Sequence, residues 1–170
     1  MIRLTGLLLV LAVSRPVSAQ PVDVPYVPTP PAVVATMLKV ARVTPADVVY
    51  DLGSGDGRIV IAAARDFGAR GVGIERNPRL VAEARAAASA AGVADRVRFV
   101  EQDFFKADLR GATVVTLYLL PTVNQAIRDK LRRELRPGTR VVSHAYAMGD
   151  WLPEFETEVE GRKVFSWIVR

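Results

Sequence analysis

The stretch that decides the fold is Val48-Val49-Tyr50-Asp51-Leu52-Gly53-Ser54-Gly55-Asp56-Gly57. Its first three residues predict a short buried strand, and a glycine loop follows and leads into the helical pattern of residues 58–67. Glycines accept positive φ angles and let the backbone approach a ligand closely. In open α/β sheets, ligands bind beyond the carboxyl ends of the strands. The stretch therefore predicts a strand–loop–helix unit with a binding site at its loop.

Strand and helix patterns alternate outward from this loop. Thr29 is the predicted N-cap of a first helix, with Pro30 in its first turn. That helix buries one face, made of Val33, Val34, Met37, Leu38 and Ala41. Helices are also predicted at residues 58–67, 79–91 and 122–135, and strands at 48–50, 71–74, 97–100, 113–120, 140–143, 155–159 and 163–169.

This alternation predicts an α/β fold, because strands separated by helices of 10–15 residues form parallel sheets. Only residues 160–162 separate the last two strands, so these form an antiparallel hairpin at one edge. We expect a Rossmann-like, seven-stranded sheet that is mostly parallel, with a C-terminal antiparallel hairpin and helices on both faces.

The composition limits the chemistry. The chain has 170 residues, enough for one domain, and a formal net charge of +5. Its basic residues are spread along the sequence, so no nucleic-acid partner is expected. The sequence contains no cysteine, which excludes disulfides, thiolate zinc sites and cysteine nucleophiles. Its single histidine, His144, excludes a histidine-rich metal site, and no metal is expected.

The N-terminus differs from the rest of the chain. Residues 1–19 combine a basic start, an apolar run and the sequence Val17-Ser18-Ala19, which is typical of a cleaved export signal. The run of about ten apolar residues is short for a membrane span, which needs about 20. These residues predict a signal peptide or an N-terminal membrane anchor, hence a periplasmic, exported or membrane-associated protein, with a cytoplasmic-side function still open. Residues 20–32 form a proline-rich linker that contributes to the site, and 33–170 form the domain.

The acids around the loop indicate the charge of the ligand. The spacing is G-x-G-x-G, whereas dinucleotide-binding loops have G-x-G-x-x-G. Asp51 and Asp56 would repel a pyrophosphate, which dinucleotide enzymes hold at a helix N-terminus. They suit S-adenosylmethionine, which carries a cationic sulfonium and an ammonium group.

Two further acids complete the predicted cofactor site. Glu75 ends the second strand and can accept both hydroxyls of a ribose. Asp103 ends the third strand and, with Phe104, suits an adenine: the acid accepts from the amine and the ring packs on the base. The predicted cofactor-binding residues are Asp51, Gly53, Ser54, Gly55, Asp56, Gly57, Glu75, Asn77, Asp103 and Phe104.

These residues carry a family resemblance. The run Asp51–Gly57, with Glu75 and Asp103, resembles class I S-adenosylmethionine-dependent methyltransferases. The longer string Asp51–Val60 is similar to the lysine methyltransferases that modify the c-subunit of mitochondrial ATP synthase and the adenine nucleotide translocase, and to their bacterial relatives. Their proline-flanked aromatic segment resembles Tyr26-Val27-Pro28-Thr29. The resemblance implies methyl transfer to a lysine of a protein substrate.

The acceptor side is predicted from two aromatic segments. Tyr26 and Tyr118 are the candidate catalytic residues, as walls that guide a lysine and, for Tyr118, as a hydrogen-bond acceptor. The candidate substrate-binding residues are Pro28, Thr29, Leu120 and Pro121. Each tyrosine also has a structural interpretation, Tyr118 as a half-buried strand residue and Tyr26 as a linker residue. A lone histidine is more often a structural hydrogen-bonding residue than a base, so we expect His144 to be structural.

Three other functions fit parts of the pattern. A methyltransferase acting on a small molecule needs the same cofactor site. A non-catalytic module that binds S-adenosylmethionine needs only the loop and its acids. A dinucleotide oxidoreductase is disfavoured by the G-x-G-x-G spacing.

Overall fold

The computed structural model describes residues 26–170, so the predicted leader at 1–19 and the start of the linker lie outside the described residues. Its helices are α1 Pro31–Val40, α2 Arg58–Phe67, α3 Pro78–Ala90 and α4 Pro121–Glu134. Its strands are β1 Val48–Leu52, β2 Arg70–Glu75, β3 Val97–Glu101, β4 Val114–Leu117, β5 Arg140–His144, β6 Phe155–Val159 and β7 Arg162–Ile168. Across residues 26–170, none of the helices is both long enough and apolar enough to span a membrane.

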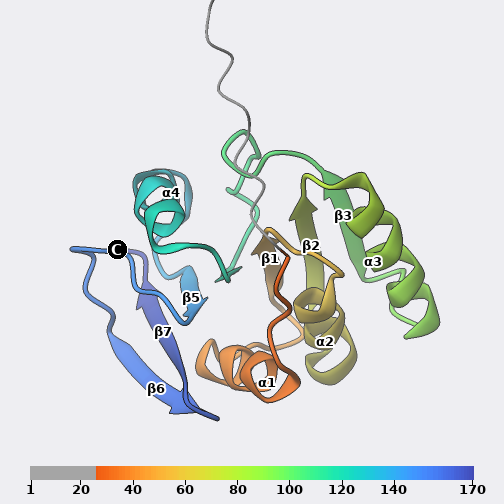
Figure 1. Cartoon of the computed structure of the whole chain (residues 1–170), viewed down its shortest axis with the longest axis horizontal. Coiled ribbons are helices and arrows are strands. Elements are labelled where there is room, and N and C mark those ends of the chain that lie inside the picture. The colour runs from red at the N-terminus through yellow and green to blue at the C-terminus, as the bar shows by residue number, and fades with distance from the viewer. Residues whose placement is uncertain (1–25) are drawn as a thin grey trace, which may run out of the picture.

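The strands form one sheet in the order β3-β2-β1-β4-β5-β7-β6 (Figure 1). The pairs among β1 to β5 are parallel, whereas β7 runs antiparallel to both β5 and β6. The predicted seven-stranded sheet with a C-terminal hairpin is confirmed. The chain moves from β1 outward to β2 and β3, then returns to the other side of β1 as β4. The carboxyl ends of β1 and β4 therefore mark the crossover position where such sheets bind ligands.

Helices cover both faces of the sheet, as predicted (Figure 1). The core on one face gathers apolar residues of α1, α2 and α3, among them Met37, Val60 and Val81. The core on the other face joins α4, through Ile127 and Leu131, to strand residues of β1, β4, β5 and β7. All five residues predicted to be buried by the first helix are buried. These two cores fix the strand ends from which the site is built.

Three local predictions are corrected by the structure. Thr29 is not an N-cap: Pro30 occupies that position, no side chain caps α1, and the Thr29 hydroxyl instead lies 3.3 Å from Nδ1 of His144. Strand β4 ends at Leu117, its last residue paired with β1 and β5. The predicted strand had continued to residue 120. The turn of the hairpin contains only residues 160 and 161, both with positive φ, as a type I′ turn requires.

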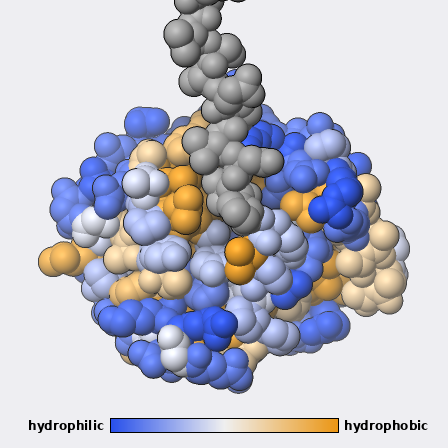
Figure 2. Space-filling view, viewed as in Figure 1, coloured by the Kyte–Doolittle hydropathy of each residue, from blue (hydrophilic) through white to orange (hydrophobic). Residues whose placement is uncertain are grey.

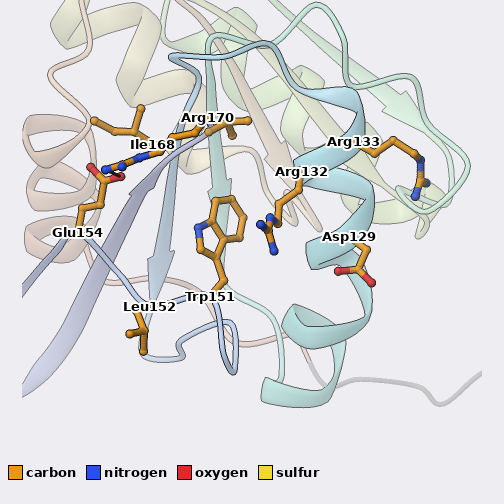
Figure 3. Close-up of a pocket in the computed structure, with 9 residues that line it drawn as sticks. Asp129, Arg132, Arg133, Trp151, Leu152, Glu154, Ile168 and Arg170 are labelled. Carbon is orange, nitrogen blue, oxygen red and sulfur yellow. Dashed lines mark hydrogen bonds and ion pairs between the residues drawn. The ribbon is translucent and has the colours of Figure 1, made fainter.

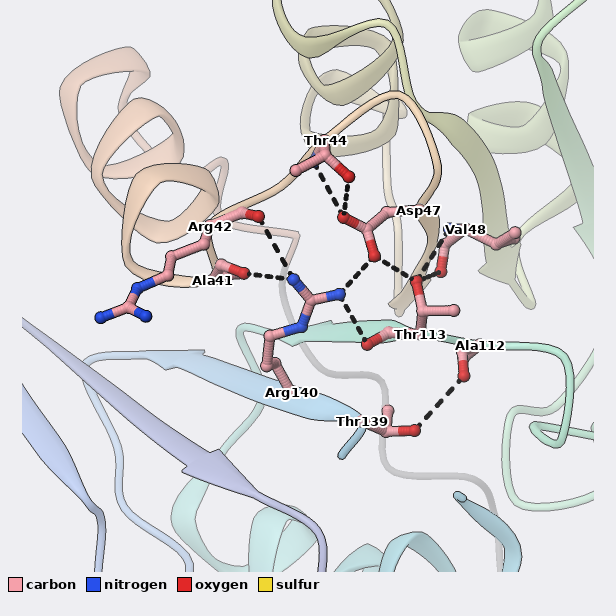
Figure 4. A network of polar contacts seen from close by, with 9 residues as sticks. All are labelled: Ala41, Arg42, Thr44, Asp47, Val48, Ala112, Thr113, Thr139 and Arg140. Carbon is pink, nitrogen blue, oxygen red and sulfur yellow. Dashed lines mark hydrogen bonds and ion pairs between the residues drawn. The ribbon is translucent and has the colours of Figure 1, made fainter. Parts of the chain in front are cut away.

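A polar network joins the amino ends of β1, β4 and β5 to the end of α1 (Figure 4). Asp47 is 5% exposed, and its carboxylate accepts from the Thr113 hydroxyl at 2.7 Å and the Thr44 amide at 2.8 Å. The Arg140 guanidinium pairs with the same carboxylate and donates to the carbonyl of Ala41 at 2.9 Å. The network holds three parallel strands and α1 in register on the side of the sheet opposite the glycine loop.

Candidate functional site

A cavity of about 1030 Å³ lies at the carboxyl ends of the parallel strands. Most of the predicted site residues line it: Tyr26, Pro28, Thr29, Asp51, Gly53, Ser54, Asp56, Glu75, Asn77, Asp103, Phe104, Tyr118 and Leu120. Leu119, which lies between Tyr118 and Leu120 in the segment predicted as an acceptor wall, also lines it. Other lining residues were not predicted from the sequence: Val27, Arg58, Ile59, Arg76, Pro78, Arg79, Leu80, Phe105 and Val123. The structure thus brings the predicted cofactor and acceptor residues into one cavity.

Asp51 is the buried acid of this cavity. It is the fourth residue of β1 and is 3% exposed, and its Oδ1 accepts a hydrogen bond of 2.7 Å from the Thr116 hydroxyl. Burial raises the pKa of Asp51 to about 7, against the lowering effect of the Thr116 hydrogen bond. A carboxylate that is desolvated in this way gains most from a cationic partner.

Glu75 organises the glycine loop from the end of β2. One carboxylate oxygen accepts from the amide of Gly55 at 3.0 Å, and the other accepts from the amide of Asn77 at 2.8 Å. The Asn77 side chain caps α3 by accepting from the Arg79 amide. Each Glu75 oxygen keeps a free lone pair, so the carboxylate can still accept from two neighbouring hydroxyls.

Asp103 lies after β3 beside two aromatic rings. Its Oδ1 accepts from the amide of Phe105 at 2.9 Å, which leaves the other oxygen available to a ligand. The rings of Phe104 and Phe105 lie 4.9 Å apart between centroids, and both line the cavity. Phe105 was not predicted, although the Phe-Phe pair after Asp103 is the signal that would have found it.

Three predicted residues do not line the cavity. Gly55 has a positive φ and lies under the Tyr26 ring, which a Cβ at this position would overlap. Gly57 is the N-cap of α2 in the left-handed region and packs against Phe99. These glycines shape the loop without facing the cavity. Pro121, the first residue of α4, is exposed and lies outside the cavity lining, so its role in substrate binding stays a prediction.

Asp56 lines the cavity but has an ionic partner within the chain. Its carboxylate pairs with the Arg58 guanidinium, at 2.6 Å between Oδ2 and Nη2. Burial works to raise the pKa of Asp56, and the hydrogen bonds from Arg58 outweigh it and hold this pKa below its ordinary value. Asp56 therefore lines the cavity as a carboxylate whose charge is balanced by Arg58, and its role in cofactor binding stays a prediction.

Aromatic residues gather at the other end of the cavity. The Tyr118 ring lies on the His144 ring, with 3.9 Å between centroids, and its plane is nearly parallel to that of Tyr146. His144 is 1% exposed and does not line the cavity. Burial lowers the pKa of His144 to about 4, so the ring is neutral at physiological pH. His144 is a structural residue behind Tyr118.

Exposed apolar side chains surround the opening of the cavity. Val27 is 57% exposed, Tyr26 43%, and Phe105 and Leu120 each 42%. On the part of the face that the grey atoms leave visible in Figure 2, hydrophobic side chains lie among hydrophilic ones. The opening therefore offers separate apolar contacts to a long aliphatic side chain.

A second groove, of about 600 Å³, lies between α4 and the end of β7. Arg132 points toward the Trp151 indole, 5.7 Å from the ring centroid, whereas Arg133 points away from it (Figure 3). Arg170 pairs with Glu154 at 3.1 Å. The second groove is lined by charged side chains of both signs that do not point to one common position. It therefore lacks the acid cluster found in the cavity at the strand ends. Among the described residues, no group of histidine, aspartate and glutamate side chains could hold a metal ion.

Comparison with known proteins identifies the chain. Residues 51–155 match the family described as the ANTKMT methyltransferase domain. The chain belongs to this methyltransferase family. A protein-lysine N-methyltransferase from Saccharolobus islandicus is 49% identical over 138 residues, which cover 81% of this chain and 86% of that protein.

Two further relatives are described with different acceptors. The adenine nucleotide translocase lysine N-methyltransferase of Mus musculus is 41% identical over 77% of this chain, which spans only 57% of the mouse enzyme. The crystal structure of an RNA methyltransferase from Salinibacter ruber, in complex with S-adenosyl-L-homocysteine, is 58% identical with a TM-score of 0.83. The aligned region covers 84% of this chain and 94% of the Salinibacter chain. As a member of the ANTKMT methyltransferase family, this chain is an S-adenosylmethionine-dependent methyltransferase.

Proposed function

We propose that this family member transfers the methyl group of S-adenosylmethionine to a lysine side chain of a protein. The observation that carries the proposal is one cavity with an acid-lined end at the carboxyl ends of β1, β2 and β3 and, after β4, an end with Tyr118 and Leu120, which we call the aromatic end. The Saccharolobus and mouse relatives, both described as lysine methyltransferases, support the choice of acceptor.

The residues of the acid-lined end fit the cofactor. Asp51 offers a buried carboxylate to the cationic amino-acid portion, and Glu75 and Asp103 keep acceptor atoms for the ribose and adenine. The Ser54 side chain also lines this end of the cavity. When bound, S-adenosylmethionine supplies an electrophilic methyl group.

The aromatic end guides and desolvates the acceptor. Tyr26, Tyr118 and Leu120 form walls along which the aliphatic stem of a lysine can lie, and its amine then points into the cavity. Desolvation there lowers the pKa of the lysine, which yields the neutral amine needed for attack. His144 does not act as the base, because it is buried behind Tyr118 with Thr29 as its partner. In this scheme the rate enhancement comes from the orientation and the desolvation of the acceptor amine.

The lining of the cavity favours a protein over RNA as the acceptor. Of its three arginines, Arg58 and Arg79 are paired with Asp56 and Glu83, so that, among the described residues, Arg76 is the one lining arginine without an ion pair. RNA binding draws on uncompensated basic groups that contact phosphates. The apolar rim suits a polypeptide, whereas the description of the Salinibacter relative makes RNA the second candidate to be tested.

Labelling with tritiated cofactor tests the acceptor class. The purified protein is incubated with methyl-labelled S-adenosylmethionine and a lysate of a strain that lacks its gene. We expect the label to be removed by protease and to be unaffected by ribonuclease. Acid hydrolysis should release it as methyllysine. Ribonuclease-sensitive label would establish RNA as the acceptor, and label confined to the small-molecule fraction would establish a metabolite. The Asp51→Asn variant is the inactive control.

Thr116→Val is expected to weaken cofactor binding by about 10-fold, because a hydrogen bond to a charged group contributes about 1.5 kcal/mol. Thr116 is fully buried, and valine keeps its shape while removing the hydroxyl that donates to Asp51. That hydrogen bond lowers the pKa of Asp51, so its loss raises the pKa further. Calorimetric titration with S-adenosylmethionine should show the binding curve displaced to higher pH. An unchanged pH dependence would contradict the role given to Asp51.

The linker is proposed to be part of the site, because its described residues Tyr26, Pro28 and Thr29 line the cavity. The assignment of residues 33–170 as the methyltransferase domain is retained as a proposal, with α1 beginning at Pro31. The export signal or membrane anchor in residues 1–19, and the location that follows from it, stay predictions. N-terminal sequencing of the mature protein from fractionated cells would test them.

A further inference from the structure

The segment Tyr26–Thr29 lines the cavity although it belongs to no helix or strand. We call these four residues the strap. Its position next to the glycine loop and the carboxyl ends of β1 and β5 follows from a few contacts made with side chains of the domain. The Tyr26 ring covers Gly55, and the Thr29 hydroxyl lies 3.3 Å from Nδ1 of His144.

Arg58, the first residue of α2, makes the contact that joins the strap to the glycine loop. Its Nη1 donates to the carbonyl oxygen of Thr29 at 3.0 Å. Its Nε and Nη2 donate to the carboxylate of Asp56 at 3.0 Å and 2.6 Å. The phenol of Tyr26 lies beside the same carboxylate, and burial together with Asp56 raises the pKa of Tyr26.

The planar guanidinium is suited to this double contact. Two of its nitrogens bind the carboxylate in a fork, and the third is left to reach a carbonyl in a different direction. A lysine ammonium can pair with Asp56 as a point charge but cannot present this fixed fork. Replacing Arg58 with lysine therefore keeps a positive charge next to Asp56 but removes the fixed bridge to the Thr29 carbonyl.

We infer that Arg58 is a positioning residue for methyl transfer. It holds the strap as a fixed wall of the cavity, and through that wall it orients the acceptor relative to the cofactor. The inference rests on the proposed function, because it concerns the acceptor of that same site. A misplacement of about 1 Å in an oriented reaction can lower the rate by about 100-fold, so a loosened wall has a measurable cost.

The kinetic test compares Arg58→Lys with Arg65→Lys. Arg65 lies in the same helix and pairs with its neighbour Asp66 at 2.7 Å, on an exposed surface that is not part of the cavity. We expect Arg58→Lys to lower the initial rate of label transfer to the protein fraction of the lysate from the strain that lacks the gene by about 10- to 100-fold, with the Kd of S-adenosylhomocysteine within about 3-fold of the parent. Arg65→Lys should match the parent in both measurements. Arg58→Met, which keeps only the aliphatic stem, serves as a second variant if the lysine form unfolds.

A spectroscopic test reads the strap without any catalytic turnover. Because the chain contains no cysteine, Val27→Cys introduces a single thiol for a nitroxide spin label. Val27 is 57% exposed, so the label can be attached to the folded protein. Electron paramagnetic resonance should report a restricted label with Arg58 present and a more mobile label in the Arg58→Lys background. The Arg65→Lys background should leave the spectrum unchanged.

The outcomes separate this inference from the proposed function. A label of equal mobility in both backgrounds would show that Arg58 does not hold the strap. Full activity in Arg58→Lys would show that only the charge next to Asp56 matters. Either result overturns the inference while methyl transfer to lysine stands. Conversely, a parent protein that labels no protein acceptor refutes the proposed function, and the spectra still report on the contact between Arg58 and Thr29.

Discussion

Replacing Asp51 with asparagine is expected to weaken S-adenosylmethionine binding by at least about 100-fold, equal to about 2.7 kcal/mol. Asparagine keeps the size of the side chain and can still accept from Thr116, so the loss isolates the negative charge. The effect is large because Asp51 is 3% exposed, and a charge–charge contact gains strength where water is excluded. Calorimetric titration at pH 8 measures it directly.

The same substitution is expected to stabilise the protein in the absence of cofactor. Burial raises the folded-state pKa of Asp51 to about 7, above the ordinary value of 3.8. The native state therefore holds its proton more tightly than the unfolded chain, and stability falls as the pH rises through this interval. The asparagine side chain cannot ionise, so melting temperatures of the variant should exceed those of the parent most clearly above pH 7. A variant that binds cofactor normally, or melts earlier at pH 8, would contradict this account of Asp51.

Replacing Asp47 with alanine is expected to lower the free energy of unfolding by about 3 kcal/mol, or the melting temperature by about 10 °C. The change leaves the Arg140 guanidinium, whose side chain is 26% exposed, without its carboxylate. It also removes the acceptor of the Thr113 and Thr44 hydroxyls. The partial exposure of Arg140 places the effect at the lower end for a broken buried pair. Asp66→Ala, which breaks an exposed pair with Arg65, should cost less than about 1 kcal/mol.

The Asp47 network also predicts how stability depends on pH. Burial alone would raise the pKa of Asp47, but hydrogen bonds from Thr113, Thr44 and Arg140 lower it overall. A folded-state pKa below the unfolded value gives a contribution that is present near neutral pH and lost as the pH falls below about 4. Denaturant titrations at pH 7 and pH 3 should show a smaller difference for Asp47→Ala than for the parent. Equal differences would show that Asp47 is not the group that titrates.

Much of the fold could be predicted because it depends on local patterns. The glycine loop, the helix over residues 58–67 and its end at Gly68 agree with the structure. Such elements are specified by periodicity and by turn residues, which lie within a few sequence positions of one another. Asp51, Glu75 and Asp103 converge for the same reason, since each lies at or just after the end of a parallel strand.

The contacts that were not predicted from the sequence join distant residues or depend on local pairing. Thr29 was predicted as a cap because its partner, His144, lies 115 positions away and no local pattern connects them. The pairing of Asp47 with Arg140 spans 93 positions. Asp56 and Arg58 are close in sequence, but nothing in the spacing shows whether a loop acid faces a ligand or an arginine.

The attachment point of the strap has a practical consequence. Tyr26 lines the cavity, so any polypeptide that precedes it, native or fused, joins the folded domain at the mouth of the site. A purification tag fused directly to Tyr26, in place of residues 1–25, would begin at this mouth and compete with substrates for access. A tag after Arg170 would join at the separate groove beside β7. Turnover measured with amino-terminal and carboxy-terminal tags should therefore differ.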